Sequence, residues 1–311
     1  MRIGIHAEHR GTEVSSLRDV LDLARDAEDR GVDLWMPQTF GLDAITALSV
    51  VCPQTTRLQV GTFVVPTYTR HPFTMAMQAL TAQSATNGRF TLGIGLSHRP
   101  VIEQVYGLSF ETPVRHLREY LSILVPVLHG ENVAFKGEEF STGGRFPIVV
   151  PGAEPPPVLV AALGAQLLRI AGRLADGTAL WMVGPKTIAD HITPIITASA
   201  EAAGRPRPEI VAGLPVTVTS DVDDARRRAE DIWAPYGTMP SYRAMLDREG
   251  VSGPADIVVM GDEESVAAQL QHILDVGATR LALTPVGSPE ERRRTFDLLG
   301  ELAAPDPRGS P

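Results

Sequence analysis

The amino-acid sequence predicts an α/β protein folded as a (β/α)8 barrel, the TIM-barrel class. Short apolar segments alternate with amphipathic helical segments, which is typical of parallel βαβ units. Eight such apolar segments occur in 311 residues, which fits a barrel with insertions. A doubly wound open sheet is the alternative, because periodicity alone does not distinguish a closed sheet from an open one.

The first half of the chain predicts four strand–helix pairs. The strands are expected at RIGIHA (2–7), VDLWMPQ (32–38), RLQVGTFVVP (57–66) and RFTLGIGLS (89–97). Helices are expected near 16–30, 43–52, 72–87, 100–107 and 112–129. The first helix has an apolar i, i+3, i+4 stripe between a capping Ser16 and a terminating Gly31.

The second half resumes this alternation after an irregular stretch. Glycines and prolines cluster in 130–156, which predicts a hairpin or an irregular insertion. Four more strands are expected at VLVAAL (158–163), TALWMV (178–183), EIVAGLPVTVTS (209–220) and RLALTPV (280–286). Helices are expected near 165–175, 186–203 and 263–276, with a last helix after strand eight.

The segment between strands seven and eight is longer than a simple connection. Its helical pattern at 222–249 is interrupted by Pro235, Gly237 and Pro240, and 256–262 predicts a small extra strand. We therefore expect one domain over 1–304, with insertions near 130–156 and 222–262, and a frayed tail at 305–311.

Composition excludes several classes of function. The formal net charge of −9 argues against nucleic acid as the main partner. The sequence contains no run of about 18 apolar residues, and its first residues, MRIGIHAEHRG, lack an apolar leader. The single cysteine, Cys52, excludes a disulfide framework and a cysteine-based zinc site. We expect a cytoplasmic enzyme acting on a small molecule, without a membrane partner.

In a barrel, the active site lies at the carboxyl ends of the strands. This position selects His6, Glu8, His9, Gln38, Thr39, Pro66, Thr67, Tyr68, Ser97, His98, 183–185 and Pro285. The motifs HExxH, GxSxG and GxxxxGK[ST] are absent from the sequence. We expect no metal site in the group His6, Glu8 and His9, because successive residues of a strand point to opposite sides and these three side chains would not all face one point.

The run GIGLSH (93–98) is the most informative local feature. It begins like a dinucleotide fingerprint, but its sixth position is His98 and no acidic residue supports a ribose contact. Gly93 and Gly95 either let a ring or a phosphate approach the backbone or accommodate packing in the barrel. The amides of Leu96, Ser97 and His98 lead into a helix N-terminus, which favours an anion.

A second candidate anion site follows strand six, in WMVGPKT (181–187). The strand ends at Gly184-Pro185, where a new helix begins and its first amides are free. Trp181 either covers an aromatic ligand or belongs to the core.

The run GTFVVPTYTRHPFTMAMQALTAQSATNGRFTLGIGLSH (61–98) resembles the luciferase-like monooxygenase superfamily, in particular its branch that depends on coenzyme F420, a deazaflavin. AGRLADGTALWMVGP (171–185) and VGATRLALTPVG (276–287) match the same pattern in order and spacing. The resemblance spans residues 1 to 302 and is weakest in 130–156 and 222–255.

This resemblance implies a bacterial luciferase-like (β/α)8 barrel with insertions, assembled as a homodimer, with a flavin-type ring at the mouth. It implies a bulge in strand three with a cis peptide bond at Phe63–Val64, and phosphate contacts after strands four and six. The implied cofactor-binding residues are Gln38, Thr39, Phe63, Val64, Gly95, Leu96, Ser97, His98, Trp181, Met182, Val183, Gly184 and Pro185.

The sequence departs from the dehydrogenases of that branch. Some of these carry an acidic residue and a histidine at the end of strand two, where this chain has Gln38 and Thr39, neither of which is a strong acid or base near neutral pH. A reductase role asks less of the protein, because the reduced deazaflavin supplies the hydride. Candidate proton donors are Tyr68, His9, Glu8 and His98.

The resemblance therefore predicts an F420-dependent oxidoreductase that transfers a hydride to a small organic substrate, such as an activated alkene, an imine or a carbonyl compound. An FMN-dependent luciferase-like monooxygenase is the alternative that keeps the same fold. A non-catalytic flavin-binding barrel is the second alternative.

Overall fold

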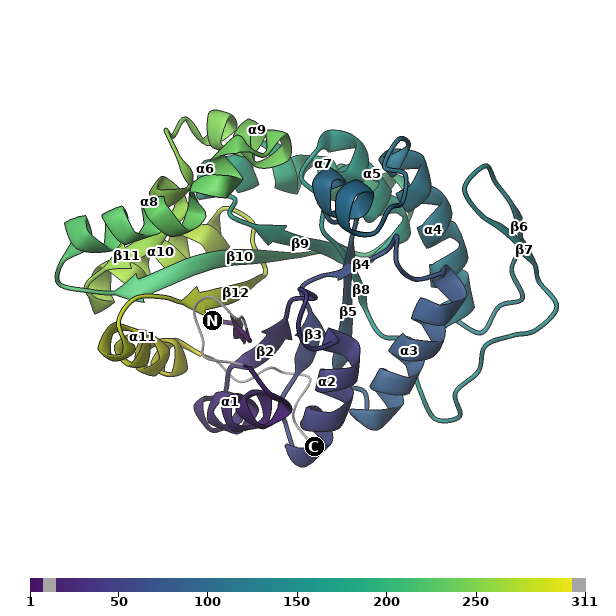
Figure 1. Cartoon of the computed structure of the whole chain (residues 1–311), viewed down its shortest axis with the longest axis horizontal. Coiled ribbons are helices and arrows are strands. Elements are labelled where there is room, and N and C mark those ends of the chain that lie inside the picture. Colours follow the sequence, from purple (N-terminus) through teal and green to yellow (C-terminus); the bar gives the residue numbers. More distant parts are fainter. Residues whose placement is uncertain (8–14, 304–311) are drawn as a thin grey trace.

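The fold is a closed barrel of eight parallel strands, seen in a computed structural model that describes residues 1–7 and 15–303 (Figure 1). In ring order the strands are β1 (Ile3–His6), β2 (Asp33–Met36), β3 (Val60–Thr62), β5 (Phe90–Gly95), β8 (Val158–Val160), β9 (Gly177–Trp181), β10 (Glu209–Val218) and β12 (Arg280–Pro285). The ring closes because β1 pairs with both β2 and β12. The expected barrel is confirmed, and an open sheet is excluded.

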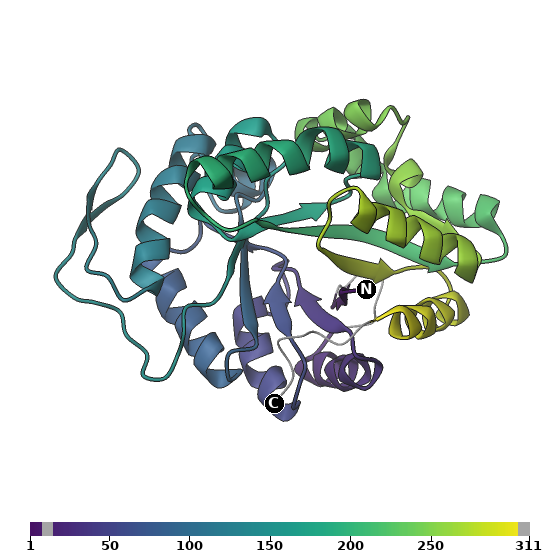
Figure 2. The same cartoon turned by 180° about the vertical axis from the view of Figure 1, so that it is seen from behind.

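Helices surround the barrel, as the alternating pattern predicts (Figures 1 and 2). Their bounds are α1 (Leu17–Arg30), α2 (Ala44–Val51), α3 (Pro72–Ala85), α4 (Pro113–Leu128), α5 (Ala165–Leu174), α6 (Pro185–Thr187), α7 (Thr193–Ala202), α10 (Glu263–Asp275) and α11 (Pro289–Leu302). Ser16 caps α1 and Gly31 ends it with a φ of 70°, both as expected. The helix expected near 100–107 is a π-helical turn, Val101–Val105, and a second such turn, Ile188–Ile192, joins α6 to α7.

Strand three is not continuous. It divides into β3 and a short β4 (Val65–Pro66) at the Phe63–Val64 bond, which is cis as the resemblance implies. A Cβ on Gly93 would lie 2.0 Å from the Thr62 carbonyl oxygen, and one on Gly95 would lie 2.7 Å from Val64 Cγ2. The sequence leaves two interpretations open for Gly93 and Gly95. Packing against the bulge explains why both positions are glycine.

Side chains fill the barrel interior. Phe63 is packed there with five residues from the neighbouring strands: Trp35, Leu159, Ala179, Val211 and Ala282. At the amino-terminal end, the buried Arg280 lies 3.1 Å from Glu209 and 3.6 Å from Asp33. This arrangement leaves the carboxyl ends of the strands as the place for a ligand.

Both insertions have regular structure. Residues 134–143 form an antiparallel hairpin, β6 (Ala134–Lys136) and β7 (Ser141–Gly143), which projects away from the barrel in both views (Figures 1 and 2). After β10 come α8 (Val222–Thr238), α9 (Pro240–Glu249) and β11 (Val259–Gly261), which pairs with the end of β10.

The expected interruption of the 222–249 segment is only partly right. Pro235 and Gly237 lie within α8, and the break comes at Met239, with Pro240 as the first residue of α9. Proline suits that first helical position because its missing N–H is not needed there. Within the described ranges, no helix is long and apolar enough to cross a membrane.

Candidate active site at the barrel mouth

His6 ends β1 and points into the barrel mouth. Its side chain is only 2% exposed, and its ring centroid lies 4.5 Å from that of Phe63 and 5.3 Å from that of Trp181. Burial lowers the pKa of His6 to about 3, so the ring is neutral at physiological pH. Nδ1 lies 3.0 Å from Thr284 Oγ1, whereas Nε2 has no hydrogen-bond partner among the described residues.

The end of β9 contributes Trp181, the ring expected to cover a ligand or join the core. Its ring is partly buried and contacts Trp233 and Tyr236 of α8, with centroids 5.6 and 6.4 Å away. Its Nε1 is buried and, within the part of the chain that is described, finds no acceptor. The next residue, Met182, is buried with a φ of 54°, a left-handed conformation that is unusual for methionine.

The loop after β5 has the same backbone feature. Ser97 has a φ of 59°, and no hydrogen bond joins the amides of Ser97 and His98 to another described residue. Burial lowers the pKa of His98, whose ring lies 6.0 Å from that of Tyr242 on α9. Strained non-glycine residues cluster at ligand sites. Among the described residues, three non-glycine residues have a positive φ: Ser97 and Met182 lie in the loops predicted to hold the cofactor phosphate, and Asn87 follows the end of α3.

The loop after β9 already holds an internal anion. Glu249, the last residue of α9, accepts hydrogen bonds from the amides of Lys186 (3.0 Å) and Thr187 (2.7 Å). A Cβ on Gly184 would lie 2.3 Å from the Glu249 carboxyl carbon, so only glycine leaves room for this contact. The carboxylate therefore lies at a helix N-terminus, where a phosphate would also be stabilised.

We expect Glu249→Gln to tighten the binding of a phosphorylated cofactor about tenfold, because the variant would remove a negative charge from the loop that is predicted to hold the phosphate. Two like unit charges about 6 Å apart repel each other by roughly 1.4 kcal/mol at an effective dielectric constant near 40. The amide oxygen still accepts a hydrogen bond from the loop. Fluorescence titration with F420 and with FMN measures the change. Glu263→Gln, on the exposed first turn of α10, is the matched control. Unchanged or weaker binding by the Glu249 variant would contradict the expectation.

The remaining predicted contacts are distributed unevenly. Gln38 is partly buried, and its side chain bonds the Ala44 amide (2.9 Å) and the Thr39 carbonyl (3.2 Å), so it supports the start of α2. Thr39 is exposed, Val64 is partly buried, and Phe63 fills the barrel interior. Leu96 and Val183 are buried beside the two loops. A cofactor contact for each of these residues remains a prediction.

Of the four candidate proton donors, Glu8 and His9 lie outside the described residues, as does the tail 305–311. Tyr68 belongs to a different cluster, stacked on His116 with centroids 3.8 Å apart, and burial raises its pKa to about 12. His116 is 5% exposed, bonds Thr67 at 3.0 Å and has a pKa lowered to about 4 by burial. With this raised pKa, the Tyr68 phenol is a weak acid near neutral pH.

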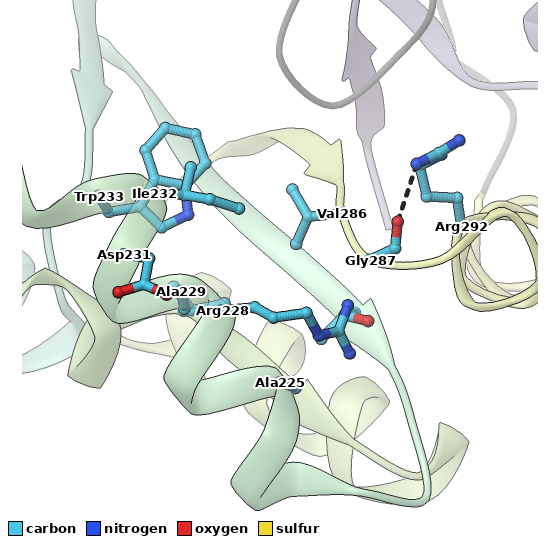
Figure 3. A pocket seen from close by; sticks show the side chains of 11 residues that line it. Ala225, Arg228, Ala229, Asp231, Ile232, Trp233, Val286, Gly287 and Arg292 are labelled. Carbon is cyan, nitrogen blue, oxygen red and sulfur yellow. Dashed lines mark hydrogen bonds between the residues drawn. The ribbon is translucent and has the colours of Figure 1, made fainter.

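A cavity of about 250 Å³ lies beside the aromatic rings of Trp181, Trp233 and Tyr236, between α8 and the ends of β10 and β12 (Figure 3). It is lined by Thr217, Ala225, Arg228, Ala229, Asp231, Ile232, Trp233, Val258, Val286, Gly287 and Arg292. Trp233 thus contacts both this cavity and Trp181. The sequence places the specificity of the pocket in the 130–156 and 222–255 insertions, the second of which contains α8, but it singles out neither Trp233 nor Tyr236, although these two have the i, i+3 spacing of one helix face.

Comparison with known proteins gives related enzymes over nearly the whole chain. An F420-dependent glucose-6-phosphate dehydrogenase of Amycolatopsis mediterranei is 27% identical over 317 residues, covering 92% of this chain and 95% of the relative. A 5,10-methylenetetrahydromethanopterin reductase of Methanolobus tindarius is 25% identical over 309 residues, covering 89% and 93%.

Solved structures share the fold. The F420-dependent tetrahydromethanopterin reductase of Methanopyrus kandleri superposes with a TM-score of 0.79 at 19% identity, covering 96% of this chain and 97% of that one. The oxygenating constituent of 3,6-diketocamphane monooxygenase from Pseudomonas putida, in complex with FMN, gives 0.73 at 15% identity and 97% coverage of both. The family model for luciferase-like monooxygenases matches residues 1–302. The chain therefore belongs to the luciferase-like monooxygenase family.

Proposed function

We propose that this protein is an F420-dependent oxidoreductase that transfers a hydride from the reduced deazaflavin to a small organic substrate with an activated alkene, imine or carbonyl group. The observation that carries the proposal is the pair of left-handed residues, Ser97 and Met182, at the two loops where a phosphate is expected. Relatives named as F420-dependent enzymes support the choice of cofactor.

The residues at the mouth fit such a group. The amides of Ser97 and His98, which have no partner among residues 1–7 and 15–303, suit a phosphate, and the buried nitrogens of His6 and Trp181 suit hydrogen-bond acceptors on a ring. When bound, F420 supplies the hydride. The protein contributes binding, orientation and exclusion of water by the aromatic side chains of α8.

The two residues after β2 support the reductase direction. Gln38 and Thr39 provide no acid or base, and the Gln38 side chain is engaged at the start of α2. Oxidation of an alcohol needs a base to accept the hydroxyl proton, whereas reduction needs only a proton that water can supply. A cytoplasmic location remains a prediction from the composition of the sequence, and a homodimer remains a prediction from the family resemblance.

Titration of the purified protein with F420 and with FMN tests the proposal. We expect saturable F420 binding, followed by oxidation of reduced F420 when a panel of enones, imines and ketones is added. The FMN alternative is favoured by the fold shared with the FMN-bound monooxygenase. Tight FMN binding with indifference to F420 would replace the proposal with that alternative. Binding of neither would favour a non-catalytic barrel.

A further inference from the structure

Three neighbouring aromatic rings at the mouth each carry a buried ring nitrogen with no hydrogen-bond partner among the described residues. These nitrogens are His6 Nε2, Trp181 Nε1 and Trp233 Nε1. The His6 and Trp181 rings are 5.3 Å apart, and the Trp181 and Trp233 rings are 5.6 Å apart. Buried polar groups in folded proteins are nearly always paired. Three exceptions on neighbouring rings at the carboxyl end of a barrel indicate that a ligand supplies the partner.

The tautomer of His6 follows from Thr284. The threonine side chain is fully buried, and its hydroxyl has no hydrogen bond to a described residue other than the one at His6 Nδ1, 3.0 Å away. Because a buried hydroxyl hydrogen needs an acceptor, the Thr284 O–H donates to Nδ1. The one proton of the neutral ring is then on Nε2. Both His6 and Trp181 therefore offer an N–H donor without a positive charge.

We propose that His6 Nε2–H and Trp181 Nε1–H together bind a carbonyl oxygen. Neutral donors suit an uncharged acceptor, whereas carboxylates and phosphates are typically bound by arginine or lysine. In a hydride addition to a carbonyl compound, the π electron pair moves onto this oxygen, and the two donors stabilise the charge until a proton is taken from water. The inference rests on the proposed function for the source of the hydride.

Two molecules could provide this oxygen, the substrate and the pyrimidine ring of the cofactor. Four variants separate these sources from a merely structural role. His6→Asn keeps a polar atom facing Thr284 but removes the ε donor, and His6→Gln keeps an N–H group near the ε position. Trp181→Phe keeps an aromatic ring without the N–H. His191→Gln is the control, because His191 is another buried histidine but its Nε2 is paired with the Leu163 carbonyl at 2.9 Å.

The measurements are calorimetric titrations of the whole chain with F420 and, at saturating oxidised F420, with cyclohex-2-enone. We expect His6→Asn and Trp181→Phe each to weaken one of these affinities about 5- to 20-fold, and His6→Gln to lose less than threefold. Weaker enone binding at unchanged F420 affinity assigns the oxygen to the substrate. Weaker F420 binding assigns it to the cofactor ring. Thermal unfolding confirms that each variant is folded.

The inference is overturned if folded His6→Asn binds both ligands like the parent protein, or if His6→Gln loses as much affinity as His6→Asn. The control His191→Gln should bind both ligands normally. A parent protein that binds neither F420 nor FMN contradicts the proposed function instead. In that case, titration of the cofactor-free variants with the enone still tests the donor pair, and equal affinities would overturn it.

Discussion

Replacing Arg280 by methionine is expected to lower the free energy of unfolding by about 3 kcal/mol, since it removes the buried cation between the partly buried carboxylates of Asp33 and Glu209 and leaves Arg2, 3.4 Å from Glu209, to offset their charge. The Arg280 side chain is 1% exposed and closes the amino-terminal end of the barrel between Asp33 and Glu209. Its guanidinium also lies 5.5 Å from the Trp35 ring centroid. Urea unfolding at pH 7 measures the loss.

The matched control is Arg294→Met, which removes an exposed ion pair with Glu263 (2.7 Å) and should cost less than about 1 kcal/mol. Neutralising the two partly buried acids as well, in the triple variant with Asp33→Asn and Glu209→Gln, should recover part of the loss. Equal effects of the Arg280 and Arg294 variants would contradict a buried charge cluster.

Acidification from pH 7 to pH 5 is expected to reduce stability by about 4 kcal/mol through two buried histidines. The folded pKa values of His6 and His116 are lowered to about 3 and about 4 by burial, whereas an unfolded histidine titrates near 6.5. Between these values the unfolded chain binds more protons than the folded one, so stability falls as the pH falls. Each histidine contributes about 2 kcal/mol over this interval.

Chemical unfolding at several pH values between 7 and 5 measures this slope. Carboxyl groups with a lowered pKa, such as Glu291 at about 2, change the stability mainly below pH 4.5, where the unfolded carboxyl group takes up its proton. The interval from pH 7 to pH 5 therefore reports mainly on the histidines. His6→Gln and His116→Gln should each remove about 2 kcal/mol of the change, and His98, whose pKa burial also lowers, contributes to the slope that remains. A flat profile in the parent protein would show that neither imidazole is held neutral by burial.

The fold could be predicted from the sequence because barrel strands alternate with helices at regular intervals. Apolar segments such as 89–97 and 280–286 are covered on both faces, and each helix brings its own signals, as Ser16 and Gly31 do for α1. The helix break that Pro235 predicts does not occur, and α8 continues through this residue. Packing of Trp233 against Trp181 accompanies a helix that continues through this position.

The positions of the two candidate loops could be predicted from the sequence. Glycines at strand ends predict the loops after β5 and β9, which contain the left-handed residues Ser97 and Met182, and cofactor binding by these loops stays a prediction. Long-range contacts carry no local signal. Glu249 meets Lys186 and Thr187 across more than 60 residues, and the Thr284 hydroxyl that sets the tautomer of His6 comes from the opposite end of the chain. Such pairs cannot be predicted from the local sequence, because the closed barrel brings their residues together.

The pairing of β11 with the end of β10 has an evolutionary consequence. Val216 pairs with Val259, so both ends of the α8–α9 segment are attached to the same strand. Trp233 and the neighbouring wall of the cavity lie on that segment. Natural variants can therefore exchange or lengthen it while the pairing of the eight barrel strands stays intact. Enzymes of this architecture can diversify the shape of the molecule they accept without rebuilding the scaffold.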